Sequence, residues 1–119
     1  MKTVKATREG LVGQRTASGY IVDTVVPFVA LPSTLALGMF VRVINPLTDK
    51  RAIAVVLDVG PWNEHDDDYV FGDARPQAES GIDTTGRPTN HAGIDLSEKV
   101  WKKLGMVDNS NVEWEFVSI

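Results

Sequence analysis

Runs of apolar and β-branched residues, separated by short polar turns, dominate the pattern of this chain. Such runs favour β-strands, because branched and aromatic side chains pack well on a pleated surface. The pattern predicts strands over residues 24–30, 39–44 and 51–57. Asn45-Pro46 and Asp49 stand between the last two strands and have turn chemistry, so these strands are expected to form a hairpin.

Residues 111–117 alternate apolar and acidic side chains, with the period of two that is typical of a strand with one buried face. This segment is the natural last strand of a sheet or barrel. The apolar residues of these strands are expected to point into a common core, namely Val41, Val43, Val55, Leu57, Val112, Trp114 and Phe116.

One segment, residues 97–104, has the periodicity of a helix. Asp95 or Ser97 is placed to accept hydrogen bonds from the first turn, and Glu98 follows Asp95 by three residues, as in a capping box. Gly105 offers the left-handed conformation that ends many helices. Short strands with one small helix indicate a mainly β domain, folded as a barrel.

Composition narrows the function classes. The 16 acidic residues outnumber the 12 basic ones, which argues against nucleic acid or an anionic membrane surface as the partner. The chain has no Cys, so thiolate metal sites and thiol nucleophiles are excluded. It has no apolar run long enough for a membrane span and no signal peptide at its start. We expect a single domain over residues 1–119, and a monomer.

Asp58 stands where the apolar run 51–57 ends, two residues before Gly60-Pro61, and a long irregular stretch follows over residues 61–93. Unstructured stretches of this length in a small domain are usually functional. A carboxyl group at such a junction can act as a general acid. The alternative is that Asp58 only accepts hydrogen bonds from turn amides, as aspartates before turns commonly do.

Within this stretch, Trp62 and Tyr69 are candidates for stacking on sugar rings, since their faces match the C–H surface of a sugar. Arg75 and Asn90 are candidate polar ligands for the same substrate and, with Arg87, are expected to pair with the acidic run at residues 65–68. That run lacks the spacing of a calcium loop, so we expect no metal and no cofactor.

Four motifs in order resemble the double-psi β-barrel domain of rare lipoprotein A, which is related in fold to expansins and glycoside hydrolase family 45. They are TASGYIVD (16–23), LPSTLALGMFVRVINPLTDK (31–50), VVLDVGPW (55–62) and GIDLSEKVWKKLGM (93–106). The resemblance implies a six-stranded double-psi barrel with one short helix and a long loop over a groove. It also implies a polysaccharide partner, which is peptidoglycan glycan in that group, where some members are lytic transglycosylases.

The resemblance assigns Asp58 the position of the family's acid, but Pro32 stands where the family has its His. Asp23 resembles the position of the catalytic base in glycoside hydrolase family 45, and His91 could replace the missing His. We therefore expect peptidoglycan cleavage with Asp58 as general acid, in the cell envelope if that polymer is the substrate. The alternatives are a glycan-binding module without activity, which Pro32 favours, and a barrel that binds a partner other than a sugar.

Overall fold

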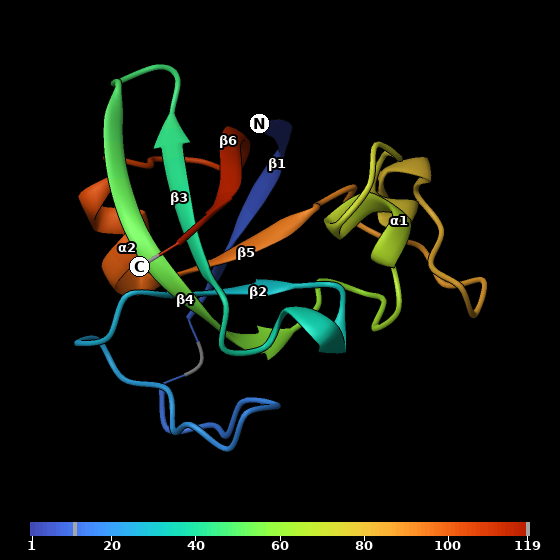
Figure 1. Cartoon of the computed structure of the whole chain (residues 1–119), viewed down its shortest axis with the longest axis horizontal. Coiled ribbons are helices and arrows are strands. Elements are labelled where there is room, and N and C mark those ends of the chain that lie inside the picture. Colours follow the sequence, from blue (N-terminus) through green and yellow to red (C-terminus); the bar gives the residue numbers. More distant parts are fainter. Residues whose placement is uncertain (11, 119) are drawn as a thin grey trace.

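The computed structural model describes residues 1–10 and 12–118, and its six strands close into a barrel (Figure 1). Their order around the barrel is β1-β5-β2-β4-β3-β6. The strands are β1 (Lys2–Glu9), β2 (Phe28–Leu31), β3 (Phe40–Asn45), β4 (Lys50–Val59), β5 (Ile94–Ser97) and β6 (Ser110–Val117).

The barrel mixes two kinds of strand pairing. The pairs β1–β5 and β2–β4 are parallel, and the pairs β2–β5, β3–β4, β3–β6 and β1–β6 are antiparallel. The hairpin of β3 and β4 was predicted from its turn residues and is confirmed. The predicted mainly β, six-stranded closed barrel is also confirmed, although it has more short helices than the one predicted.

Most of the residues predicted to point into the barrel are buried there, but the prediction for β4 is wrong. Val41, Val43, Val112 and Trp114 are fully buried inside the barrel, as expected. On β4 the inward residues are Ala52, Ala54 and Val56, whereas Val55 and Leu57 are only partly buried. The prediction failed here because both faces of this strand are apolar, so alternation gives no preference.

The helix α2 (Glu98–Lys103) lies on the outside of the barrel and contacts β4 and β5. Its N-cap is Ser97, whose side chain accepts a hydrogen bond from the Val100 amide at 3.4 Å. Asp95 therefore does not cap this helix but lies within β5. Glu98 pairs with Arg8 of β1 at 2.6 Å, and so ties the helix to the barrel.

Pattern reasoning missed β1 and β5 and placed the start of β2 too early. β1 mixes charged and apolar residues without strict alternation, and β5 has only four residues, too few for its alternation to stand out beside the helix that follows. Residues 24–27 are not strand, because the Asp23 carboxylate accepts hydrogen bonds from the Val25 and Val26 amides at 2.8 and 3.2 Å and holds a turn there.

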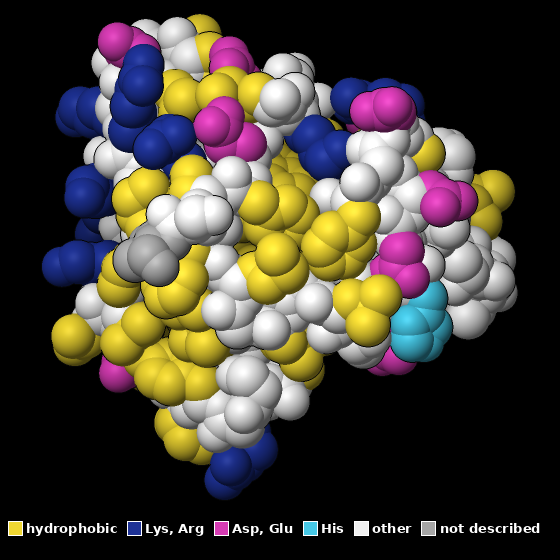
Figure 2. Space-filling view, viewed as in Figure 1, with side chains coloured by type: hydrophobic (Ala, Val, Ile, Leu, Met, Phe, Trp, Pro, Cys, Tyr) yellow, Lys and Arg dark blue, Asp and Glu magenta, His cyan; other side chains and the backbone are white. Residues whose placement is uncertain are grey.

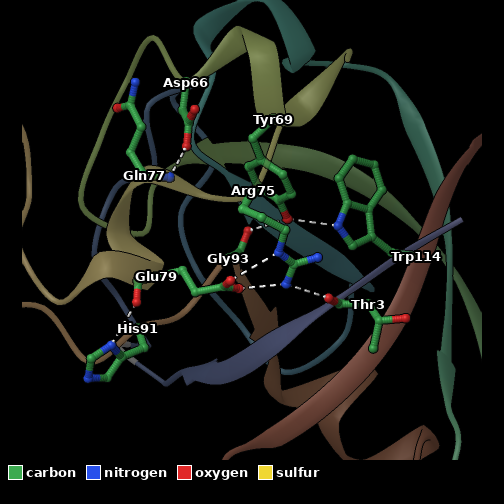
Figure 3. Close-up of polar contacts among 9 residues, drawn as sticks. All are labelled: Thr3, Asp66, Tyr69, Arg75, Gln77, Glu79, His91, Gly93 and Trp114. Carbon is green, nitrogen blue, oxygen red and sulfur yellow. Dashed lines mark hydrogen bonds and ion pairs between the residues drawn. The ribbon is translucent and has the colours of Figure 1, made fainter. Parts of the chain in front are cut away.

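The long stretch of residues 61–93, here called the excursion, is folded and lies beside the barrel (Figure 1). It contains α1 (Asp67–Val70) and the 3₁₀ turn η2 (Gln77–Ser80), and another 3₁₀ turn, η1 (Thr34–Ala36), precedes β3. The Tyr69 hydroxyl joins the excursion to the barrel: it donates to the Gly93 carbonyl and accepts from the Trp114 indole, both at 2.9 Å (Figure 3).

The acidic run is not held by the basic residues that we expected. Arg75 pairs with Glu79 at 2.6 Å, and Arg87 pairs with Asp83 at 2.9 Å. The run instead uses its own carboxylates, since Asp66 accepts from the Gln77 amide at 2.7 Å (Figure 3) and Asp67 accepts from the Ser33 hydroxyl at 2.5 Å. Over the described ranges, no helix is both long and apolar enough to cross a membrane.

Candidate functional site

Thr7, Asp95, Ala30 and Asp58 come from four neighbouring strands and form one row across the barrel. Thr7 of β1 pairs with Asp95 of β5, Asp95 pairs with Ala30 of β2, and Ala30 pairs with Asp58 of β4. Paired residues of neighbouring strands share a face of the sheet. The two aspartates therefore stand on either side of the small Ala30, and the Thr7 hydroxyl donates a hydrogen bond to Asp95.

A β-bulge brings Asp58 into this row. Val29 pairs with Val56, but the next residue, Ala30, pairs with Asp58, so β4 has one residue more than β2 at this point. In a regular strand Asp58 would share the inner face with Val56. The additional residue turns Asp58 to the outer face instead, which places a carboxylate outside the apolar core.

The loop of residues 12–27 lies against Asp58. Oδ1 of Asp58 accepts hydrogen bonds from the backbone N–H groups of Ala17 at 2.8 Å and Val59 at 2.9 Å. The Ser18 amide donates to the Leu57 carbonyl at 3.2 Å. Asp58 therefore fixes this loop on the outer face of the barrel through the amide contacts that the turn interpretation described.

Glu9, at the end of β1, joins the two aspartates. Burial raises the pKa of Glu9 to about 9, and the contact with Asp58 and its charge add to the shift. Burial also raises the pKa of Asp95 to about 6, opposed by the Thr7 hydrogen bond and supported by the charge of Asp58. At neutral pH Glu9 therefore holds a proton, and Asp95 exchanges its proton near pH 6.

A groove of about 510 Å³ opens beside Asp95, and Thr7, Trp62 and Asn90 are among its lining residues. Trp62 has a φ of 73°, a conformation that a bulky residue adopts only where its surroundings hold it. Its indole N–H donates to Oδ1 of Asn90 at 2.8 Å, and the side chain is 39% exposed. The groove thus combines an acid of raised pKa with a fixed aromatic ring.

The two other predicted catalytic residues have different surroundings. Asp23 accepts hydrogen bonds from the Val25 and Val26 amides, and the nearby Tyr20 hydroxyl is the largest cause of its lowered pKa, ahead of these two amides. His91 is exposed, and its Nδ1 lies 3.0 Å from the Glu79 carbonyl oxygen in the excursion (Figure 3). The hydrogen bonds of Asp23 thus stabilise a turn, and the hydrogen bond of His91 lies within the excursion.

The predicted substrate-binding residues divide between two hollows. Trp62 and Asn90 line the groove beside Asp95, whereas Tyr69 and Arg75 line a second pocket of about 490 Å³ between β6 and the excursion. Hydrophobic side chains gather where the excursion meets the barrel (Figure 2). Tyr69 is only 1% exposed there, and its ring packs edge-on against Trp114.

Sequence reasoning missed Glu9 and Thr7 and gave Asp95 the role of a helix cap. All three lie on β1 or β5, the strands that the pattern did not reveal. The sequence had one usable signal, namely the isolated acids Glu9 and Asp95 at the ends of short segments with apolar residues. In residues 1–10 and 12–118, no group of three or more His, Asp or Glu side chains is arranged to hold a metal ion.

The fold defines this chain as a closed, mixed six-stranded β-barrel protein with an acid cluster at its outer face. It belongs to the family described as "Domain of unknown function (DUF8814)", which matches residues 1–115. A comparison with curated proteins gave no match. Among solved structures, Streptomyces papain inhibitor (SPI) is similar in fold, with a TM-score of 0.58 and 20% sequence identity over 98% of this chain and 94% of the inhibitor chain.

Proposed function

We propose that this domain binds a polysaccharide in the groove beside Asp95 and cleaves a glycosidic bond there, with Asp95 as the proton donor. The observation that supports the proposal best is the position of Asp95. It lines a groove that also holds an aromatic ring, and burial raises its pKa to about 6. A carboxyl group that keeps its proton near the working pH is what glycosidic cleavage needs.

The chemistry requires little more than this acid. Asp95 protonates the departing glycosidic oxygen, and the carboxylate that remains then takes the proton of the attacking oxygen, which comes from water or from a hydroxyl of the bound sugar itself. Asp58 was the acid suggested by the sequence resemblance, and in the proposal it has a supporting part. Its charge lies close enough to raise the pKa of Asp95, while its own oxygen holds the Ala17 amide.

The polymer that we propose is the glycan of peptidoglycan, on the strength of the motifs in residues 16–106 that resemble rare lipoprotein A. A sugar ring would stack on Trp62, whose indole is held by Asn90, and its hydroxyl groups would meet the Asn90 and Thr7 side chains. These contacts would place the scissile bond next to Asp95.

A second candidate is a glycan-binding domain without activity. It is favoured by Pro32, which is buried at the position of the family's His, and by the amide contacts that engage Asp58. Under this alternative the groove and Trp62 keep their binding role, and the acids have only structural effects.

The experiment is incubation of the purified chain with peptidoglycan glycan strands that have been stripped of stem peptides, followed by mass analysis of the soluble products. Anhydro-sugar ends or new reducing ends, formed by the natural chain and lost in Asp95→Asn, support cleavage. Binding of the strands without any released product over days supports the second candidate. Absence of both binding and cleavage rejects a glycan function.

A further inference from the structure

A third pocket, of about 510 Å³, adjoins Trp62, which also lines the groove beside Asp95. Trp62 lines both pockets, so one ligand that stacks on this ring can extend into each of them. The lining of this third pocket is mostly polar and includes Asn63, Glu64, His65 and Arg87.

Arg87 is held in a fixed orientation by the loop of residues 82–88. The Asp83 carboxylate, whose side chain is 1% exposed, accepts from the Thr85 amide and from the Arg87 amide, each at 2.9 Å. Its other oxygen accepts from Nε of Arg87 at 2.9 Å. These hydrogen bonds, with the Arg87 amide contact as the largest cause, lower the pKa of Asp83 to about 2, so the carboxylate is charged at any physiological pH.

The same loop is fastened to the residue after Trp62. Oδ1 of Asn63 accepts from the Thr84 amide at 3.1 Å and from the Thr84 hydroxyl at 3.0 Å, and Asn63 is 4% exposed. The wall that bears Arg87 therefore has a fixed place relative to the Trp62 ring. A guanidinium that is prepositioned in this way loses little freedom when it binds a ligand.

The contacts of Arg87 engage only one edge of its guanidinium group. Nε contacts Asp83 and the Thr85 hydroxyl, and the two terminal nitrogens make no hydrogen bond within the described part of the chain. The side chain is 68% exposed. Two free N–H groups side by side match the two oxygens of a carboxylate, which a guanidinium binds more specifically than an ammonium does.

We propose that this pocket binds a carboxylate group of the ligand through Arg87, so that the ligand is an acidic sugar chain rather than a neutral one. The inference rests on the proposed function, because it takes the ligand in the two pockets to be one sugar chain across Trp62. The other ionisable side chains of the pocket are His65 and Glu64. Glu64 opposes a bound carboxylate and so limits its affinity.

The test compares one glycan in two charge states. Peptidoglycan strands stripped of stem peptides have free lactyl carboxylates, and conversion of these groups to methyl amides gives a neutral ligand of almost the same shape. The fluorescence of the chain is titrated with each ligand. The natural chain should bind the carboxylate form about tenfold more tightly, the effect of roughly 1.4 kcal/mol, and added salt should reduce this preference.

Variants test whether Arg87 causes the preference for the carboxylate form. Arg87→Gln should bring the two affinities to within about twofold, Arg87→Lys should keep part of the preference, and Glu64→Gln should increase it. Arg51→Gln is the matched control, because Arg51, at the start of β4, is also an exposed arginine paired with an aspartate. Circular dichroism spectra check that each variant is folded. If Arg87→Gln is unfolded, the binding preferences of Arg87→Lys and Glu64→Gln test the inference in its place.

Equal affinity of the natural chain for both strands, or an unchanged preference in Arg87→Gln, overturns this inference and leaves the proposed function standing. If neither strand binds, the proposed function fails. Titration with D-glucuronate alone, followed by NMR at the Arg87 and Trp62 side chains, then decides the carboxylate site: shifts at Arg87 that are absent with D-glucose support it, and no shifts overturn it.

Discussion

Asp58 and Asp95 flank Ala30 on the outer face of the barrel, one on each neighbouring strand. Two strand spacings separate their backbones, so their Cα atoms are about 10 Å apart. Ala30 is fully buried between them, and the charge of Asp58 contributes to the raised pKa of Asp95. The bulge in β4 creates this relationship, since without it Asp58 would face the core.

Asp95→Asn should lower the rate of glycan cleavage by about 10²–10⁴-fold, because an amide has nearly the shape of the acid but cannot donate the proton. In the natural chain the rate should fall as the pH rises through about 6, where Asp95 loses its proton. The measurement is the pH dependence of product release at saturating glycan.

Asp58→Asn tests whether the charge of Asp58 raises the pKa of Asp95. The amide oxygen can still accept from Ala17 and Val59, so the domain should fold, but the negative charge that raises the pKa of Asp95 is gone. The falling limb of the pH profile should therefore move to lower pH, while activity in acid remains. Complete loss of cleavage at every pH would instead make Asp58 the proton donor.

Glu9→Gln should stabilise the fold at alkaline pH by on the order of 1–3 kcal/mol, because it removes a buried group that must become charged. Glu9 has a raised pKa of about 9 in the folded chain against about 4.5 when unfolded. The unfolded chain thus releases this proton first, and folding stability falls as the pH rises from about 4.5 to about 9.

Urea unfolding at pH 4, 7 and 9 measures this effect. The natural chain and Glu9→Gln should have similar free energies of unfolding at pH 4 and should diverge as the pH rises. Glu113→Gln is a suitable control, since Glu113 lies on β6, outside the acid cluster. A constant difference between Glu9→Gln and the natural chain at all three pH values would mean that Glu9 is not protonated in the fold.

Trp62→Ala should weaken glycan binding by about tenfold, because the ring face next to Asp95 is lost. Trp62→Phe should retain most of the affinity, as it keeps an aromatic face and loses only the N–H group that donates to Asn90. Titration of tryptophan-independent signals, such as heat, gives both affinities. Equal affinities for the natural chain and Trp62→Ala would place the glycan elsewhere.

Gly93→Ala should destabilise the fold by about 2 kcal/mol or more through overpacking. A Cβ atom at Gly93 would lie 2.8 Å from Cγ of Pro76, 2.9 Å from Cβ of Val4 and 3.0 Å from the Tyr69 hydroxyl oxygen. The substitution would therefore displace Tyr69, whose hydroxyl joins the excursion to Trp114 of the barrel (Figure 3).

Gly10→Ala is the matched control for that substitution, since a Cβ atom there meets nothing within 4 Å. Thermal unfolding followed by circular dichroism compares the two variants. A melting temperature of Gly93→Ala equal to that of Gly10→Ala would show that the excursion can shift without cost.

Local sequence patterns were enough to predict the class of fold, one hairpin, the C-terminal strand and the helix. These elements have strong local signals: β-branched runs and turn residues for β3 and β4, strict alternation for β6, and Ser97 and Gly105 at the ends of α2. It also made Asp58 and Trp62 candidates for a site, because both stand where an apolar strand gives way to a long loop.

The contact of Glu9 with Asp58, and its position near Asp95, depend on how distant segments of the chain pack. Glu9 and Asp95 are 86 residues apart in the sequence and lie on two strands that were not predicted. The parallel pairing of β1 with β5 brings them close together. The bulge that turns Asp58 outward depends on the pairing of β4 with β2, and the order of apolar and polar residues along β4 does not reveal it. Burial then raises the pKa values of Glu9 and Asp95, and burial depends on how distant segments pack rather than on neighbouring residues.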